Sequence, residues 1–150
     1  MDDIDRKIIK ILSEDARRSL SDIGNAVGLA PSSVNERIKR LGASGTLRRF
    51  TVETDPATMG LPVLAFIWVA LRENADEDLF RSFVAESPHV LECHHVTGAW
   101  SYLIKIRFAQ PADIEPFLAA LKAHRFLGRS ETILALSSPV LGVFVADGDA

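Results

Sequence analysis

The sequence has almost no cysteine and no long hydrophobic run, and each absence excludes a class of protein. Its single cysteine, Cys93, cannot form an intrachain disulfide, which excludes a disulfide-stapled scaffold and favours a reducing compartment. The main apolar run, at residues 62–71, spans ten residues, about half of the roughly 20 that a membrane-spanning helix needs. The N-terminus MDDIDRKIIK lacks the basic-then-apolar pattern of a secretory signal. We therefore expect a cytoplasmic protein without a membrane partner.

A strong excess of charge is also missing, but the charges are unevenly distributed. The 17 Lys and Arg and 20 Asp and Glu give a net charge of −3, which taken alone argues against a nucleic-acid partner. Residues 1–52 nevertheless carry ten basic and seven acidic side chains, whereas the remaining 98 carry seven basic and thirteen acidic. A basic first third joined to an acidic remainder indicates two modules with different partners.

The first third has the periodicity of short helices. Apolar residues recur at helical spacing over residues 3–15, and Asp2 or Asp3 is placed to cap that helix. A second helix is expected to begin at a cap on Ser21 and to end at Gly28, because glycine tolerates a left-handed backbone.

A third helix follows directly. Pro31 suits its first turn, where the missing N–H is no loss. Gly42 weakens this helix and Gly45 is expected to end it. Its narrow apolar stripe comprises Val34, Ile38 and Leu41.

After Gly45 the pattern of apolar and polar residues changes from that of a helix to that of an extended strand. Residues 47–52 are expected to form a short strand as one arm of a two-stranded wing, so that residues 1–52 make a winged helix-turn-helix. Residues 53–61 are a plausible linker, and residues 62–150 form the second domain. Its β-α-β-β-α-β order predicts a ferredoxin-like antiparallel sheet with both helices on one face, hence an α+β chain. The expected strands are 62–72, 90–97, 100–108 and 129–136, the helices are 76–87 and 112–123, and a last extended piece is 140–145.

The first strand of that domain is apolar on both faces. In residues 63–71 both sets of alternating side chains are hydrophobic, whereas a sheet with one wet face should alternate apolar and polar residues. We expect a second subunit to cover the outer face, giving at least a homodimer. The alternative is that residues 140–145 or a loop cover it within one chain.

Residues 21–40, SDIGNAVGLAPSSVNERIKR, have the helix, tight turn and helix of a helix-turn-helix motif. The width of an α-helix matches the DNA major groove. With the apolar stripe turned inward, the opposite face carries Ser32, Glu36, Lys39 and Arg40, with Ser33 and Asn35 on its flanks. The alternative is that Glu36 and Arg40, four residues apart, simply pair on a solvated helix.

The expected partner is double-stranded DNA. Lys or Arg can bind guanine, Asn can pair with adenine and Glu can accept from cytosine, while basic residues beside the helix meet phosphates. Two recognition helices in a dimer would require a roughly palindromic operator. The predicted DNA-binding residues are Arg17, Arg18, Ser32, Ser33, Asn35, Glu36, Arg37, Lys39, Arg40, Arg48 and Arg49.

Three segments carry a resemblance to a known family. DDIDRKIIKIL, SDIGNAVGLAPSSVNERIKRL and LECHHVTGAWSYLIKI are similar to the Lrp/AsnC family of transcriptional regulators, also called feast/famine regulators. The resemblance implies a sequence-specific regulator with a winged helix-turn-helix, a hinge strand and a ferredoxin-like domain. It also implies dimers that commonly assemble into tetramers or octamers, and a small effector, often an amino acid, bound between dimers. No enzymatic activity and no cofactor are expected.

The effector loop departs from the family pattern. Members typically read Gly-Asp-x-Asp-Tyr, whereas this chain reads GAWSY over residues 98–102, so both carboxylates are missing. Because an acidic pair is a natural partner for an ammonium group, we expect an effector that is not held through its amine, or a loss of sensing. Trp100 and Tyr102 are expected to alternate on one strand, either as packing residues or as an aromatic wall of the effector pocket. The implied effector-binding set is Thr97, Gly98, Ala99, Trp100, Ser101, Tyr102 and Thr132.

Two further departures affect the third helix. Ala30 stands where members usually have a serine N-cap, which should cost about 1 kcal/mol unless Ser32 or Ser33 takes over the cap. Gly42 stands where an acidic residue is usual, which favours an early end of the helix.

Two other functions stay open. Sirohaem decarboxylases resemble the same two-domain architecture, and His94, His95 and His124 leave such an enzyme possible. A metabolite sensor with a vestigial DNA-binding module is the third candidate. Cys93, His94 and His95 invite a metal site, but neighbours on a strand face apart, so the three cannot converge and no metal is expected.

Overall fold

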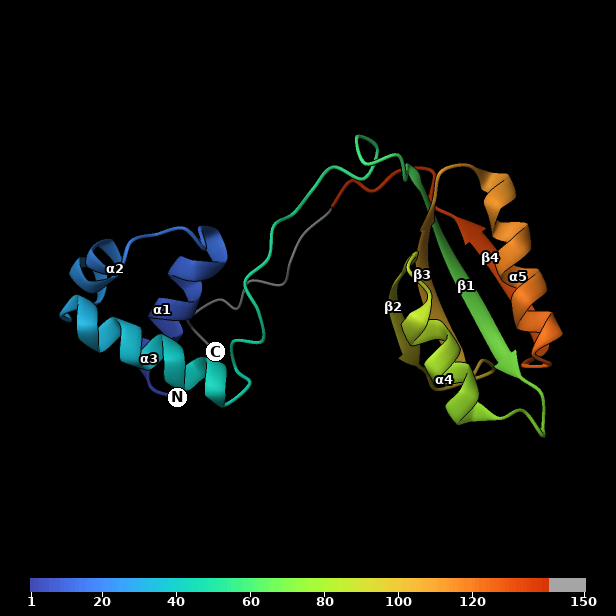
Figure 1. Cartoon of the computed structure of the whole chain (residues 1–150), viewed down its shortest axis with the longest axis horizontal. Helices are drawn as coiled ribbons and strands as arrows, with labels where there is room; N and C mark the ends of the chain where they lie inside the picture. Colours follow the sequence, from blue (N-terminus) through green and yellow to red (C-terminus); the bar gives the residue numbers. More distant parts are fainter. Residues whose placement is uncertain (141–150) are drawn as a thin grey trace. The chain divides into compact units, whose positions relative to one another are not determined.

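The computed structural model describes residues 1–140, which divide into two compact units. Met1–Glu53 belong to the first unit and Thr54–Pro139 form the second. The first is helical, and the second combines a sheet with helices (Figure 1). Among the described residues, no helix is both long and apolar enough to cross a membrane.

The first unit confirms the predicted helix-turn-helix and its preceding helix. Asp2 caps α1, because its side chain accepts the backbone N–H of Asp5 at 2.8 Å. The cap of α2 is Ser19 rather than Ser21, since the Ser19 hydroxyl accepts the N–H of Asp22 at 3.1 Å. The helices are α1 (Asp3–Glu14), α2 (Leu20–Val27) and α3 (Pro31–Ala43), and their shared core contains Ile8, Leu12, Ile23 and Val34.

The third helix keeps its full length despite the two departures. Ala30 is the N-cap and makes no side-chain capping bond, yet α3 still begins at Pro31, so neither serine of its first turn takes over the cap. The helix continues through Gly42 to Ala43, so an early end there is wrong. Packing of its apolar stripe against α1 and α2 outweighs the weak local propensity.

The predicted wing strand at residues 47–52 is wrong, because the structure has no strand between α3 and residue 63. A strand needs a neighbour to share its ladder of hydrogen bonds, and the described part of the first unit offers none. Leu47 instead donates its N–H to the carbonyl of Leu41 at 3.0 Å and packs against the helical core. The segment carrying Arg48 and Arg49 is therefore an irregular connection.

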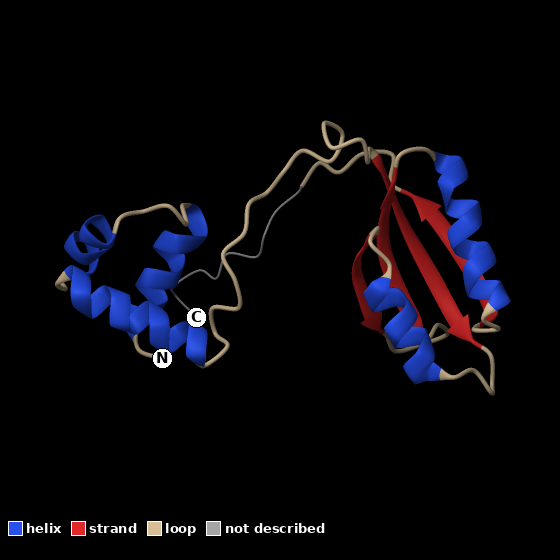
Figure 2. Ribbon diagram, in the orientation of Figure 1, coloured by secondary structure: helices blue, strands red, loops and turns tan. Residues whose placement is uncertain are grey.

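The second unit has the predicted ferredoxin-like order. The antiparallel sheet has the strand order β2-β3-β1-β4. Contacts such as Phe80 with Phe126 and Phe83 with Phe117 join both helices over the same buried face (Figure 2). The elements are β1 (Val63–Leu71), α4 (Glu77–Glu86), β2 (Val90–His95), β3 (Tyr102–Phe108), the single 3-10 turn η1 (Pro111–Asp113), α5 (Ile114–Ala123) and β4 (Leu127–Leu134).

The two faces of this sheet differ in burial. Ala65, Ile67 and Val69 are fully buried beneath the helices. Their neighbours Phe66 and Trp68 point to the other face and are only half-buried. The extended piece expected at 140–145, which was one candidate cover for that face, lies outside the described residues apart from its first residue.

Candidate functional site

The turn between α2 and α3 fixes how α3 is presented. A Cβ added at Gly24 would lie 2.4 Å from the carbonyl oxygen of Leu29, so only glycine permits this approach. The N–H of Leu29 donates to the Gly24 carbonyl at 2.9 Å. Gly28 ends α2 with φ 73° in the left-handed region. These contacts hold α2 behind α3 and leave the far side of α3 exposed.

The exposed side of α3 carries the short polar residues predicted to face DNA. Ser32, Ser33 and Glu36 are exposed, and Asn35 is half-buried. The Nζ of Lys39 lies 3.1 Å from a Glu36 carboxylate oxygen, and both side chains remain mostly exposed. This pairing differs from the alternative expected from spacing, in which Glu36 pairs with Arg40.

Arg37 and Arg40 take part in a different arrangement, because both reach across to α1. Arg37 Nη1 lies 2.7 Å from an Asp2 oxygen and 2.8 Å from an Asp5 oxygen. Arg40 Nη2 donates to both oxygens of Asp5 at 3.0 Å. The structure thus gives these two arginines protein partners, whereas the sequence placed Arg40 on the open face of α3.

Asp5 is the centre of this cluster. Its residue is 1% exposed, and it is the one charged residue buried among those described. Hydrogen bonds from the Arg37 guanidinium and the Asp2 backbone outweigh burial and lower the pKa of the Asp5 carboxyl. The Arg37 hydrogen bond also lowers the pKa of Asp2, to about 2. Both carboxylates are therefore charged at neutral pH and neutralise the two arginines.

Sequence reasoning did not identify Asp5 as a functional residue, although a signal was present. Asp5 shares the helical face of Ile8 and Leu12, and an acidic residue on an apolar stripe requires a buried cation. Arg37 correspondingly borders the apolar stripe of α3, between Val34 and Leu41. Only the packing of α1 on α3 shows that these positions meet.

The remaining predicted cations lie beside the motif. Arg17 and Arg18 are in the turn between α1 and α2, and Arg48 and Arg49 follow α3. All four are exposed. No acidic side chain among residues 1–140 lies within ion-pair distance of any of them. Their charge is therefore available to a polyanion.

In the second unit, the predicted effector loop is fastened to β1. The N–H of Ser101 donates to the Val69 carbonyl at 2.8 Å, and the Ser101 hydroxyl accepts the N–H of Leu71 at 3.0 Å. Arg129 Nη2 donates to the carbonyl of Ala99 at 3.0 Å. A guanidinium thus contacts the backbone at Ala99, one of the two positions where the family pattern has a carboxylate.

The expectation that Trp100 and Tyr102 share one strand is wrong, because β3 begins only at Tyr102. Trp100 lies against Trp68 and Arg129, with the guanidinium 4.2 Å from its ring centroid. Tyr102 is instead buried on the helix side, where its hydroxyl accepts from Arg81 Nε at 2.7 Å and donates to a Glu77 carboxylate oxygen. The two rings therefore do not form one aromatic wall.

The other residues of interest also separate between the two faces. Thr132 lies opposite the buried Ile67, on the helix side of the sheet. Cys93 and His95 face that side as well, whereas His94 bonds Glu92 on the opposite face at 3.1 Å. Within residues 1–140, no group of three or more His, Cys, Asp or Glu side chains could hold a metal ion.

Comparison with known proteins places this geometry in one family. Residues 1–42 match the AsnC-type helix-turn-helix domain, and residues 64–142 match the Lrp/AsnC ligand binding domain. The chain belongs to the Lrp/AsnC family of transcriptional regulators. It is a DNA-binding regulator whose second unit is a ligand-binding domain.

Individual relatives of this Lrp/AsnC protein match between 79% and 99% of the chain. The HTH-type transcriptional regulator FL11 of Pyrococcus horikoshii is 33% identical over 92% of this chain and 91% of its own length. LrpC of Bacillus subtilis is 33% identical over 79% of this chain and 81% of its own. A transcriptional regulator from Neisseria meningitidis, solved with L-Met, is 26% identical, with a TM-score of 0.91 over 99% of this chain and 97% of that one.

Proposed function

We propose that the exposed side of α3 reads the bases of an operator in the major groove. The observation that carries this assignment is the separation of side chains on α3, with the arginines tied to α1 and the outward side left to shorter polar groups. Lys39 can bind guanine, Asn35 adenine and Glu36 cytosine, with Ser32 and Ser33 beside them.

The phosphate contacts are assigned to the exposed arginines around α3. Arg17 and Arg18 flank its partner helix, and Arg48 and Arg49 follow it on the connection. Such contacts set register and salt dependence rather than base preference. Arg40 bonds Asp5 as Arg37 does, but its side chain is 62% exposed and its Nη1 and Nε have no hydrogen-bond partner among the described residues, so we assign it a weaker phosphate contact than these four. Arg37 is assigned to holding α3 on α1.

The proposed working form is at least a homodimer joined through the outer face of the sheet. Phe66 and Trp68 are half-buried there, and Ile133 is 46% exposed. Contiguous apolar surface of this kind typically marks an interface. A two-fold dimer presents two copies of α3, so the operator should be roughly palindromic. Tetramers or octamers of such dimers remain part of the proposal.

The effector is proposed to differ from an ordinary amino acid held through its amine. Residues 97–102 contain no carboxylate, and Arg129 adds positive charge at Ala99. The Neisseria regulator was solved with L-Met, which supports a small metabolite as the class. Saturable micromolar binding of an unmodified amino acid that is lost in Ser101→Ala would contradict the proposal.

A purely regulatory role is proposed over the enzymatic one. His94 and His95 point to opposite faces of the sheet, so they do not converge on one substrate. The intact α3 surface argues against a vestigial DNA module. Selection of bound fragments from genomic DNA by the full chain, followed by fluorescence anisotropy, tests this directly. Failure to enrich any sequence would favour a stand-alone sensor, and retention of a tetrapyrrole would favour the enzyme.

A further inference from the structure

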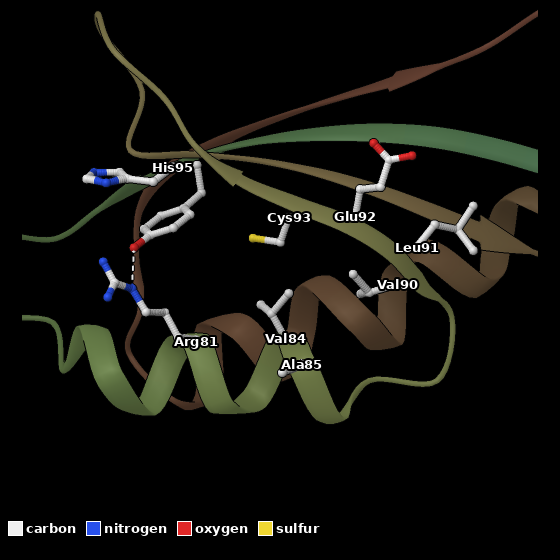
Figure 3. A pocket seen from close by; sticks show the side chains of 9 residues that line it. Arg81, Val84, Ala85, Val90, Leu91, Glu92, Cys93 and His95 are labelled. Atoms are coloured by element: carbon white, nitrogen blue, oxygen red, sulfur yellow. Dashed lines mark hydrogen bonds between the residues drawn. The ribbon is translucent and has the colours of Figure 1, made fainter. Parts of the chain in front are cut away.

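A cavity of about 500 Å³ lies between α4 and the edge strand β2 (Figure 3). Its volume falls within the range of about 300–1,000 Å³ that is usual for small-molecule sites. The cavity shares no residue with the loop at residues 96–101, but Tyr102, which belongs to the effector-binding set implied by the resemblance, lines one end of it. Its walls include Arg81, Val84, Ala85, Val90, Cys93 and His95.

One end of the cavity is polar and held in place. Arg81 Nε donates to the Tyr102 hydroxyl, and Arg81 Nη2 lies 2.7 Å from a Glu77 oxygen. The His95 ring stacks on the Tyr102 ring with centroids 4.9 Å apart. Arg81 Nη1 has no hydrogen-bond partner among residues 1–140. Glu77, which also accepts from the Tyr102 hydroxyl, compensates part of the Arg81 charge. The Nη1 edge of the guanidinium is left free to donate to a carboxylate.

The rest of the cavity is apolar. Val84 and Ala85 of α4 face Val90 of β2, and the Cys93 side chain lies between the two elements (Figure 3). Desolvation raises the pKa of the Cys93 thiol, so the thiol stays neutral and behaves as a small apolar group. This end accommodates a compact hydrocarbon body.

The nearby acidic group at the far end does not oppose an anion. Glu92 borders the cavity, but its carboxylate accepts from Lys105 Nζ at 2.6 Å and from His94 at 3.1 Å. In Figure 3 that carboxylate points away from α4. Its charge is therefore compensated outside the cavity.

We propose that this cavity binds a small carboxylate with a branched apolar body, with the carboxylate on Arg81 and the body against Val84, Ala85 and Val90. The claim that this ligand regulates DNA binding rests on the proposed effector control. The claim that the cavity binds the ligand does not. Tyr102 is the first residue of β3 and directly follows the loop fastened by Ser101. A ligand on Arg81 thus acts on a residue adjoining that loop.

The chain supplies its own reporter, because Cys93 is its single cysteine and is exposed at the cavity. The full chain is alkylated with neutral iodoacetamide, and the rate is followed by mass spectrometry. The probes are 4-methylpentanoate, its amino derivative L-leucine and the uncharged 4-methylpentanamide. With 4-methylpentanoate at about ten times its dissociation constant, alkylation should slow about tenfold, since only the empty cavity reacts. Protection by L-leucine as well would support the site and would place the leucine ammonium group beside Glu77. Protection by 4-methylpentanoate alone would support a site that rejects an ammonium group.

Two variants decide whether the protection comes from this cavity. Arg81→Gln should abolish protection by 4-methylpentanoate, whereas Lys122→Gln, at an exposed cation on α5, should retain it. Ala85→Leu, which fills the cavity, should slow alkylation without any probe. Calorimetry with the same probes measures affinity independently of the thiol. Equal protection by the amide, protection that survives Arg81→Gln, or no heat and no protection from any probe would each overturn the proposal.

A separate readout distinguishes this proposal from effector control. Operator binding by the full chain is measured by anisotropy with and without 4-methylpentanoate. Protection of Cys93 with unchanged operator affinity supports the site and rejects its regulatory role. Loss of protection with normal operator binding rejects the site and leaves the DNA-binding regulator intact.

Discussion

Six of the seven arginines of the first unit, those predicted to bind DNA, fall into two groups with different partners. Arg37 and Arg40 bond the carboxylates of α1, and Asp5 among these is 1% exposed. Arg17, Arg18, Arg48 and Arg49 are exposed without ion-pair partners in the described chain. In this motif some arginines hold α3 on α1 and others are free to attract DNA. Only the second group contributes its full charge to the field that attracts DNA. Four predictions, from the largest expected effect to the smallest, test this division.

The largest effect should come from Asp5→Asn. The change keeps the shape of the side chain but leaves Arg37 and Arg40 without their buried anion, which should lower the free energy of unfolding by about 3 kcal/mol. Urea unfolding followed by circular dichroism measures it. The matched control is Asp3→Asn, an exposed residue of the same turn, which should unfold almost as the parent does. Equal stability of the two variants would contradict a structural role for the cluster.

Acid should weaken the same cluster. The pKa of Asp2 is about 2 in the folded chain and that of Asp5 is also lowered, against an ordinary value of 3.8. Carboxyls that are more acidic when folded stabilise the protein above about pH 3.8, and this contribution is lost as the pH falls towards about 2. Unfolding free energies measured across this window should fall more steeply for the parent than for Asp5→Asn. Parallel pH profiles would reject this assignment.

On the open side of α3, Lys39→Ala should weaken specific binding by about 1–3 kcal/mol if Lys39 reads a base. Binding to unrelated DNA should change little, so the ratio of specific to non-specific affinity falls. Competition anisotropy with the selected operator and a scrambled duplex measures this ratio. A loss of equal size on both duplexes would move Lys39 into the phosphate-binding group.

The smallest effect is expected for Arg48→Ala. An exposed arginine on a phosphate should weaken binding to all sequences alike and reduce the slope of log affinity against log salt by about 1. Arg37→Ala, which removes a structural arginine, should lower stability and leave that slope near the parent value in the folded fraction. If both variants change the slope equally, the two groups of arginines are not distinct.

Local periodicity was sufficient to predict most of the helices and strands of the two units and their succession along the chain. The stripe of Val34 and Leu41 and the two-sided apolar pattern of β1 each specify an element through its own burial. Side-chain partners were not predictable, because Asp5 and Arg40 are 35 residues apart and meet only through the packing of α1 on α3. The same reason explains why spacing suggested Glu36 as the partner of Arg40.

One expected strand did not form and another begins later than expected, and both outcomes depended on neighbours. The segment at 47–52 has a strand-like composition but no adjacent strand among the described residues. Composition alone could therefore not show whether a strand forms there. Trp100 had the alternation of a strand residue, yet the hydrogen bonds of Ser101 to β1 form the turn that leaves Trp100 before β3. In each case the outcome depends on contacts between residues that are far apart in the sequence, which a short stretch of sequence does not reveal.

Two hydrogen bonds of Ser101 connect the loop directly to β1. Ser101 bonds Val69 and Leu71 at the end of a strand of nine residues. The other end of that strand, Val63, continues into the connection that leads back to the first unit. A ligand that pulls the loop aside must break two hydrogen bonds at one end of β1. From that attachment, the path along the chain to the DNA-binding helices runs through β1 and then the connection at residues 54–62.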